Sequence, residues 1–169
     1  MLFRKYPQWI NKNKILNLRK ERGTLKGDIG ELIVKNKIPY CHRTREMSPD
    51  YLNRIKFRIP ANIKDYLKRN WYTIDLFSFI VENDEINALN VYEVKMRNFY
   101  SDESKKKFPR PKITSNSLEA YEEALKLGIK VTYIEIILFD NWEYYLFSKE
   151  FNPSDFTISN GTPEYSIKK

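Results

Sequence analysis

The fold is decided by two stretches, TIDLFSFIV at residues 73–81 and NVYEVKM at residues 90–96. Both are rich in β-branched and aromatic residues, and the first is apolar on both faces, as in a central strand. Asn83 and Asp84 lie between them and favour a turn. We therefore expect strands at about residues 74–81 and 86–96, joined as a hairpin.

Charged residues interrupt both predicted strands. Glu93 and Lys95 are two positions apart, so in a strand their side chains point to the same face, roughly 7 Å apart. Asp75 interrupts the first strand, and a hairpin register that places it beside Glu93 would bring two carboxylates together. A divalent cation resolves such repulsion, and hard oxygen ligands favour Mg²⁺ or Mn²⁺. Lys95 would then be placed to orient water or neutralise charge on a phosphate.

The clearest helix in the sequence is predicted at about residues 24–36, where Thr24 can cap the first turn. Its apolar residues recur at helical spacing on one face: Leu25, Ile29, Leu32 and Ile33. Glu31 is expected to face away from this stripe and to be available for a site. Gly27 and Gly30 each destabilise a helix by about 1 kcal/mol relative to Ala, which indicates close packing against the helix backbone.

The remaining segments predict a single domain over residues 1–169, with a core at about 24–148. We expect helices at 8–21, 61–69 and 115–127, and strands at 55–59, 131–139 and 142–147. The polar segment 149–169 is expected to be an irregular tail. This order favours an α/β fold in which helices flank one central mixed β-sheet.

The spacing of the charged residues resembles the motif of the PD-(D/E)XK nuclease superfamily, an acid followed after a variable spacer by Glu-x-Lys. Here the motif is Asp75, a 17-residue spacer, and Glu93-Val94-Lys95. The family often has Pro before the first acid, where this chain has Ile74. Residues 27–31, GDIGE, resemble the family's helix glutamate and are most similar to those of archaeal and viral Holliday junction resolvases.

The resemblance covers about residues 24–139 and implies a restriction-endonuclease-like core with α-β-β-α-β order. It implies a Mg²⁺- or Mn²⁺-dependent endodeoxyribonuclease in which Asp75, Glu93 and the carbonyl of Val94 hold the metal. Lys95 would position the attacking water, and Glu31 would assist the metal or its water shell. DNA is the implied partner, and a homodimer is expected because related enzymes often act as dimers. A virus-encoded enzyme acting in its host cell would fit the same group.

Other interpretations of these residues remain open. Glu93 and Lys95 could form an ion pair on a solvent-facing sheet, with Asp75 at a strand edge and Glu31 as a solvated helix residue. The whole protein could bind nucleic acid on a nuclease scaffold without cutting it. It could also be a nuclease with another role, such as restriction or repair.

Positive charge is concentrated in two segments that flank the acids in sequence. The net charge is +8, to which residues 40–71 contribute +5 and residues 96–112 contribute +4. Such a distribution favours a polyanionic partner. The candidate DNA contacts are Arg43, Arg45, Lys56, Arg58, Arg97, Lys105, Lys106, Lys107, Arg110 and Lys112. Phe99, Tyr100 and Phe108 could stack on unpaired bases or anchor their loop.

Cysteine and histidine usage excludes several classes of site. Cys41 is the only cysteine, so an internal disulfide, a Cys-based zinc site and an iron–sulfur cluster are excluded, which fits a reducing cytoplasm. His42 is the only histidine, so a His-pair site is excluded. The first 14 residues have no apolar run of the signal-peptide kind, and no apolar stretch reaches roughly 18 residues. We therefore expect a soluble cytoplasmic protein without membrane association.

Overall fold

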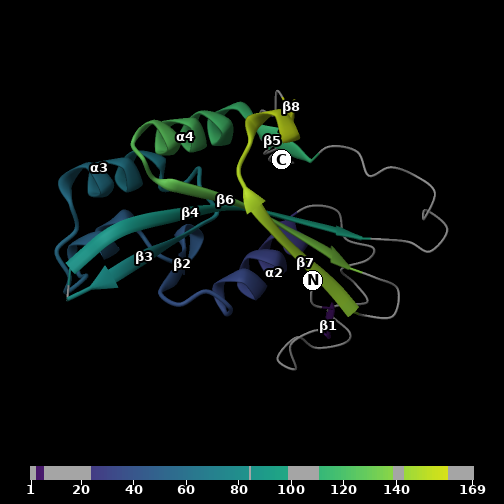
Figure 1. Cartoon of the computed structure of the whole chain (residues 1–169), viewed down its shortest axis with the longest axis horizontal. Helices are drawn as coiled ribbons and strands as arrows, with labels where there is room; N and C mark the ends of the chain where they lie inside the picture. Colours follow the sequence, from purple (N-terminus) through teal and green to yellow (C-terminus); the bar gives the residue numbers. More distant parts are fainter. Residues whose placement is uncertain (1–2, 6–23, 84, 99–110, 139–142, 160–169) are drawn as a thin grey trace, which may run out of the picture.

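The computed structural model describes residues 3–5, 24–83, 85–98, 111–138 and 143–159, which form an α/β structure around a mixed sheet (Figure 1). The six strands of this sheet have the order β1–β7–β6–β4–β3–β2. They are β1 (Phe3–Lys5), β2 (Cys41–Arg43), β3 (Leu76–Glu82), β4 (Glu85–Asn98), β6 (Lys130–Leu138) and β7 (Glu143–Glu150). The α-helices are α2 (Thr24–Lys35), α3 (Ala61–Asn70) and α4 (Ser115–Lys126). No helix in these ranges is long and apolar enough to cross a membrane.

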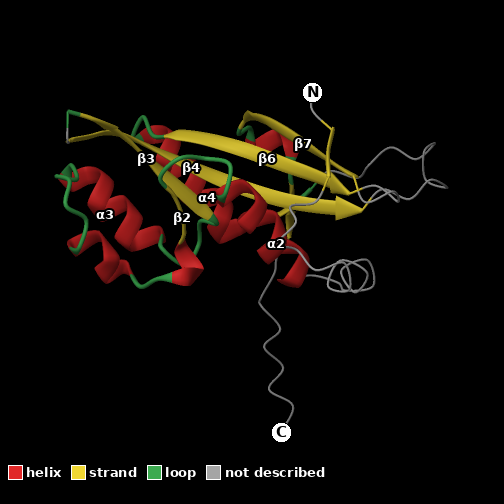
Figure 2. Cartoon of the chain, turned by 90° about the horizontal axis from the view of Figure 1, so that it is seen from below, coloured by secondary structure: helices red, strands yellow, loops and turns green. Residues whose placement is uncertain are grey.

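The helices cover the two faces of the sheet separately, with α3 and α4 on one face and α2 on the other (Figures 1 and 2). Strand side chains alternate between the faces, so two hydrophobic cores form. The core under α3 and α4 includes Trp71, Phe77 and Tyr121. The core under α2 includes Tyr92 and Val94. The predicted central mixed sheet with flanking helices is confirmed.

The predicted hairpin is also confirmed. Strands β3 and β4 pair antiparallel from Leu76 opposite Tyr92 to Glu82 opposite Glu85, with Asn83 in the left-handed region at a φ of 52°. Strand β4 then pairs in parallel with β6, and α4 makes the connection between them. A small second sheet joins β5 (Lys112–Thr114) to β8 (Thr157–Ser159) in parallel.

The close packing predicted for the helix glycines holds at one of them. A Cβ atom on Gly30 would lie 3.3 Å from Met96 Cβ and 3.5 Å from Val94 Cγ1, whereas a Cβ on Gly27 would have no atom within 4 Å. The backbone of α2 therefore lies directly on β4 at Gly30. The buried side of the helix includes Val34, while Leu32 is only partly buried, so the apolar face is turned from the expected stripe.

Two expected elements differ from the structure, and one strand was not expected. Residues 55–59 alternate in burial as expected but form only an isolated bridge, Arg58 to Glu85, because their apolar side chains pack on the α3 core without a strand partner. The segment after 149 is not wholly irregular, since β7 continues to Glu150 and β8 follows a 3-10 turn at Pro153–Asp155. The short strand β2 was not expected. The predicted helix at 8–21 lies outside the described residues.

Candidate functional site

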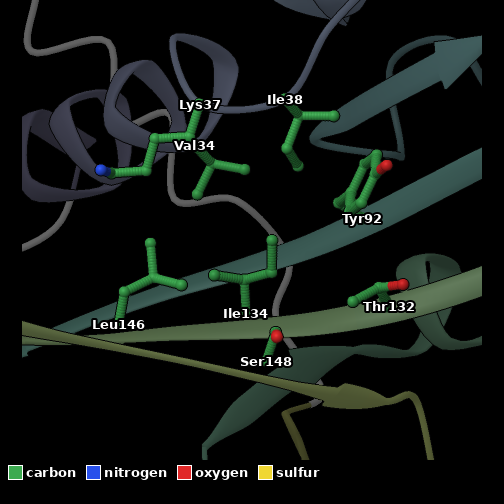
Figure 3. Close-up of a pocket in the computed structure, with 8 residues that line it drawn as sticks. All are labelled: Val34, Lys37, Ile38, Tyr92, Thr132, Ile134, Leu146 and Ser148. Atoms are coloured by element: carbon green, nitrogen blue, oxygen red, sulfur yellow. The ribbon is translucent and has the colours of Figure 1, made fainter. Parts of the chain in front are cut away.

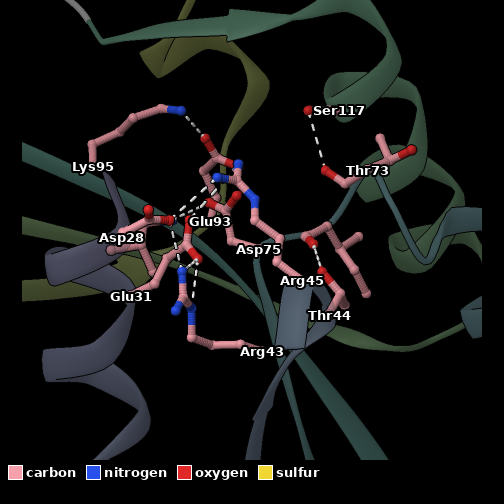
Figure 4. A network of polar contacts seen from close by, with 12 residues as sticks. Asp28, Glu31, Arg43, Thr44, Arg45, Thr73, Asp75, Glu93, Lys95 and Ser117 are labelled. Carbon is pink, nitrogen blue, oxygen red and sulfur yellow. Dashed lines mark hydrogen bonds and ion pairs between the residues drawn. The ribbon is translucent and has the colours of Figure 1, made fainter. Parts of the chain in front are cut away.

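Asp75 and Glu93 lie side by side at the end of the hairpin away from its turn. Strand β3 starts at Leu76 opposite Tyr92, so Asp75 is one residue before that pair and Glu93 is one residue after it. Asp75 Oδ2 accepts a hydrogen bond from Val94 N at 3.0 Å, which fixes its carboxylate against β4. The two acids and Lys95 converge in Figure 4. The hairpin register therefore brings the two carboxylates together.

Glu93 is buried, with only 2% of its surface exposed. Its Oε1 atom contacts the ammonium of Lys95 as an ion pair, and the Tyr121 hydroxyl also interacts with the Glu93 carboxylate. Burial, together with the neighbouring charge of Asp75, raises the pKa of Glu93 to about 7, although Lys95 acts in the opposite direction. The solvent-facing ion pair considered above is therefore wrong for Glu93, which pairs with Lys95 inside the protein.

Lys95 links the buried acid to the solvent. Its side chain is 31% exposed, so the ammonium lies at the boundary of the site. Burial lowers the pKa of Lys95, but the adjacent Glu93 and Asp75 outweigh this and raise it overall. The raised pKa therefore favours the charged ammonium of Lys95 at neutral pH.

Glu31 reaches the same region from α2 and is also buried, with 2% exposed. Arg43 Nε donates to its Oε2 at 2.9 Å, and Arg45 Nη2 lies 3.9 Å from its Oε1 (Figure 4). Burial and the charge of Asp75 raise the pKa of Glu31, while the two arginines lower it. The solvated alternative for Glu31 is therefore wrong, and the side chain is instead held by arginines.

Arg43 is the centre of a charge cluster between α2 and the segment after β2. Its guanidinium bonds Asp28 at 2.8 Å and Glu46 at 3.2 Å in addition to Glu31, and Glu46 also pairs with Lys35. Arg43 was predicted to contact DNA. Its burial and its three carboxylate partners argue against that role, because no free side of the guanidinium remains. It is better described as the residue that orients Glu31.

Buried polar residues that the sequence motif did not indicate hold the backbone around Asp75. The hydroxyl of Tyr121, on α4, accepts from Asp75 N at 3.4 Å and donates to Tyr92 O at 3.2 Å. Thr44 donates to Ile74 O at 2.7 Å, and Trp71 Nε1 donates to Thr44 O at 3.0 Å. These hydrogen bonds connect the segment after β2, the segment before β3, strand β4 and helix α4. Only the high β-propensity around Asp75 pointed to this junction in the sequence.

The predicted DNA contacts do not all gather at the acids. Lys56 and Arg58 are exposed. The backbone of Arg58 forms an isolated β-bridge with Glu85 at the turn of the hairpin. Glu85 is eight residues from Glu93 along β4, or roughly 26 Å at about 3.3 Å per residue. Arg97, two residues after Lys95 on β4, pairs with Glu135 at 2.5 Å. Arg45 is about half exposed beside Glu31, and Lys112 is exposed at the start of β5. Residues 105–107, Arg110 and the three loop aromatics lie outside the described residues.

A cavity of about 210 Å³ lies on the α2 face, away from the acids (Figure 3). It is lined by Val34, Lys37, Ile38, Tyr92, Thr132, Ile134, Leu146 and Ser148. The lining contains no carboxylate, so this cavity cannot supply the metal ligands predicted from the sequence. Its walls are mostly apolar side chains of the core beneath α2.

The acidic site fits a hard divalent cation through its donor chemistry. Asp75 and Glu93 offer carboxylate oxygens, although the buried Glu93 Oε1 atom already contacts the Lys95 ammonium. Within those residues, however, no three His, Cys, Asp or Glu side chains converge as a ready cage. Mg²⁺ commonly uses one or two carboxylates and keeps several waters, so two acids suffice.

Comparison with known proteins adds no identification: no protein-family model, curated protein or solved structure matches the chain. The function of this chain must therefore be inferred from the chemistry of its side chains.

Proposed function

We propose that this chain is a metal-dependent endonuclease that hydrolyses phosphodiester bonds of DNA, on a core of the restriction-endonuclease-like type. The observation that carries the proposal is Glu93, a buried carboxylate beside a second carboxylate and a single lysine. Burying such a group is costly unless it is used or fully paired. Strongly perturbed acids of this kind cluster at functional sites.

Asp75 and Glu93 would hold Mg²⁺ or Mn²⁺, with the carbonyl of Val94 and Glu31 as further candidates. A bound divalent cation supplies Lewis-acid activation of water and neutralises charge on the phosphate. The hydrogen bond from Val94 N keeps Asp75 Oδ2 directed at β4, which leaves the other carboxylate oxygen for a ligand. Tyr121 holds the backbone of both strands, so the spacing of the two acids is fixed before any ligand binds.

Lys95 is suited to binding the reacting phosphate and orienting the attacking water. Its raised pKa keeps it charged at neutral pH, so it stabilises the negative charge that develops on the phosphate in the transition state. Its partial exposure gives it access to a substrate while its contact with Glu93 places the ammonium at the acids. Arg45, about half exposed beside Glu31, would hold the adjoining backbone.

A second function has its own supporting observation. Each buried acid already has a cationic partner from the chain, Arg43 for Glu31 and Lys95 for Glu93. Such pairing is a way to stabilise a charge cluster without any metal. The alternative is therefore a protein that binds nucleic acid on a nuclease scaffold and does not cut it.

The experiment that separates the two is cleavage of supercoiled plasmid with Mg²⁺, Mn²⁺ or EDTA. Wild type is compared with Asp75→Asn and Lys95→Ala, which remove a ligand and the phosphate-binding cation. Metal catalysis supplies several kcal/mol, so we expect losses on the order of a thousandfold for each. Glu123→Gln is the matched control, because this α4 carboxylate pairs with Arg69 away from the acids. Wild type that binds DNA yet cuts none under any metal would replace the endonuclease with the binding protein.

The structure selectivity of the enzyme is tested with the same preparation. Linear duplex, single strands and a synthetic four-way junction of equal length are offered in competition. Preference for the junction would support the resolvase-like role, whereas equal cutting of all duplex substrates would indicate a general nuclease.

A further inference from the structure

Tyr72 is the most exposed large hydrophobic residue of the described chain, at 83%. Its neighbours are the opposite, since Trp71 is fully buried and Ile74 is 2% exposed. Single exposed aromatics are common on protein surfaces, so exposure alone carries no function. What distinguishes Tyr72 is the backbone that holds it and its position in the sequence.

The turn that carries Tyr72 is fixed on both sides. Trp71 Nε1 donates to the carbonyls of Thr44 and Met47, at 3.0 and 2.8 Å. Thr73 N donates to Asn70 O at 2.9 Å, and the Thr73 carbonyl accepts from Ser117 Oγ at 3.3 Å. A rigid backbone therefore presents a ring that the protein itself leaves uncovered, which lowers the entropy cost of binding to it.

The turn lies next to the acidic site. Tyr72 is three residues before Asp75, and three residues span at most about 11 Å of extended chain. The phosphates of one duplex strand are spaced about 3.4 Å apart along the helix axis, so about three nucleotides span this distance. A strand whose phosphate lies at Asp75 and Glu93 therefore places a neighbouring base within reach of the Tyr72 ring.

The N-terminus of α4 adjoins the same turn. Thr114 caps the helix by accepting from Ser117 N at 3.2 Å, and Ser117 in turn contacts Thr73 (Figure 4). The first turn contains no acid, and its residues Ser115 and Asn116 are exposed. The unpaired N–H groups of a helix start attract phosphate, and the exposed Lys112 adds charge just before it.

We propose that Tyr72 and the start of α4 form a subsite for an unpaired nucleotide next to the scissile phosphate. The Tyr72 ring stacks on the base, while the helix start carries the adjoining phosphate. Base faces inside a duplex are covered by their neighbours, so an aromatic ring finds a free face only on an unpaired or terminal base. This inference rests on the proposed nuclease function and assigns it a substrate class: strands with unpaired bases beside the cut.

The test measures how tightly the protein binds a fluorescent single-stranded 20-mer and the same sequence as a blunt duplex. The buffer contains Ca²⁺, chosen to prevent cutting. Tyr72→Ala should lose about tenfold to a hundredfold in affinity for the single strand, as expected for one lost stack. Its affinity for the duplex should change much less. Tyr72→Phe keeps the ring and should bind like wild type. Tyr40→Ala is the matched control, because Tyr40 is also exposed but precedes β2 at the end away from Arg43.

A stacking readout accompanies the affinities. A 20-mer with 2-aminopurine at each position in turn should show a fluorescence change on binding wild type and Tyr72→Phe at one or two positions, which Tyr72→Ala abolishes. Equal affinities of Tyr72→Ala and wild type for the single strand would overturn the subsite, as would equal losses on single strand and duplex. If the subsite is overturned but wild type still cuts plasmid with metal, the nuclease proposal stands. If wild type does not cut plasmid, both proposals fail.

A variant at the helix start separates folding from binding. Asn116→Asp adds a negative charge where the helix dipole favours it, so the melting temperature should hold or rise. Binding of the single strand should nevertheless weaken, and the loss should shrink as salt is raised, because phosphate repulsion is screened. Unchanged affinity at low salt would remove α4 from the subsite.

Discussion

Glu31 and Glu93 are equally buried, at 2% exposed, but their partners differ. Glu31 receives a hydrogen bond from Arg43, whose guanidinium also bonds Asp28 and Glu46. Glu93 has one lysine, and the Tyr121 hydroxyl interacts with its carboxylate. The first carboxylate is held by arginines, whereas the second has a single, partly exposed cation as its partner.

The difference assigns separate roles to two acids that the sequence motif treats alike. A satisfied buried ion pair stabilises and orients. A metal ligand must be deprotonated, so a buried acid with a raised pKa would link metal binding to pH. Under the proposed function, Glu31 would set the geometry of the site from α2, and the ionisation of Glu93 would be coupled to metal binding.

The largest expected effect comes from breaking the Glu31 network. Arg43→Met leaves Glu31 buried without its principal partner, and removal of one member of a buried pair costs about 3–5 kcal/mol. We expect a loss of this size in the free energy of unfolding, measured by urea denaturation. Glu31→Gln/Arg43→Met should recover much of it, because the double variant leaves no uncompensated charge. A double variant no more stable than Arg43→Met would contradict the assigned pairing.

A smaller effect concerns the ionisation of Glu93. Its pKa is raised from 4.5 to about 7, so the native state binds its proton more tightly than the unfolded state. The resulting stabilisation is complete below pH 4.5 and is lost as pH rises through about 7. At 1.36 kcal/mol per unit, the shift corresponds to at most about 3 kcal/mol.

Thermal melts in EDTA from pH 5 to pH 8 measure this loss. Burial raises the pKa of Glu31 too, so the comparison of wild type with Glu93→Gln isolates the contribution of Glu93. The variant should have a shallower fall in melting temperature over this range. Mg²⁺ or Mn²⁺ should restore wild-type stability at pH 8 and leave the variant unchanged. Parallel pH curves for the two proteins would show that Glu93 does not titrate in this window.

The smallest expected effect concerns Arg45, whose guanidinium lies 3.5 Å from Asp28 and 3.9 Å from Glu31. As a partly exposed cation beside the acids, it opposes metal binding. Exposed pairs are worth about 0.2–1 kcal/mol, so Arg45→Ala should tighten Mn²⁺ binding by about twofold to fivefold in isothermal titration. Arg54→Ala removes the same charge from another exposed position and should leave Mn²⁺ affinity unchanged. Weaker Mn²⁺ binding by Arg45→Ala would show that Arg45 supports the ligands instead.

Local patterns were sufficient for much of the fold. The hairpin followed from two apolar stretches around Asn83, and α4 matches the helix predicted at 115–127, which ends before Gly128 at a φ of 73°. The strand expected at 55–59 failed because alternation reports which side chains are buried, and these residues are buried against α3 without a neighbouring strand. Strand β2 has only three residues, too few for a periodic signal.

In the candidate site, too, local patterns predicted some residues and missed those placed by tertiary packing. Asp75, Glu93 and Lys95 could be brought together because strand register converts sequence spacing directly into position. The partners of Glu31 could not, since Arg43 reaches it from a segment whose placement depends on tertiary packing. The two bonds of the Tyr121 hydroxyl to neighbouring strands leave no trace in the local sequence.

The position of Glu31 depends on how closely α2 approaches β4 at Gly30. The missing Cβ atom lets α2 rest on Met96 and Val94, and the next residue of the helix is the acid. A Cβ atom at position 30 would lie only 3.3 Å from Met96 Cβ, so α2 or β4 would have to shift by a few tenths of an ångström, and Glu31 would shift with the helix. The position of the Glu31 carboxylate thus depends on the preceding residue having no side chain larger than a hydrogen atom.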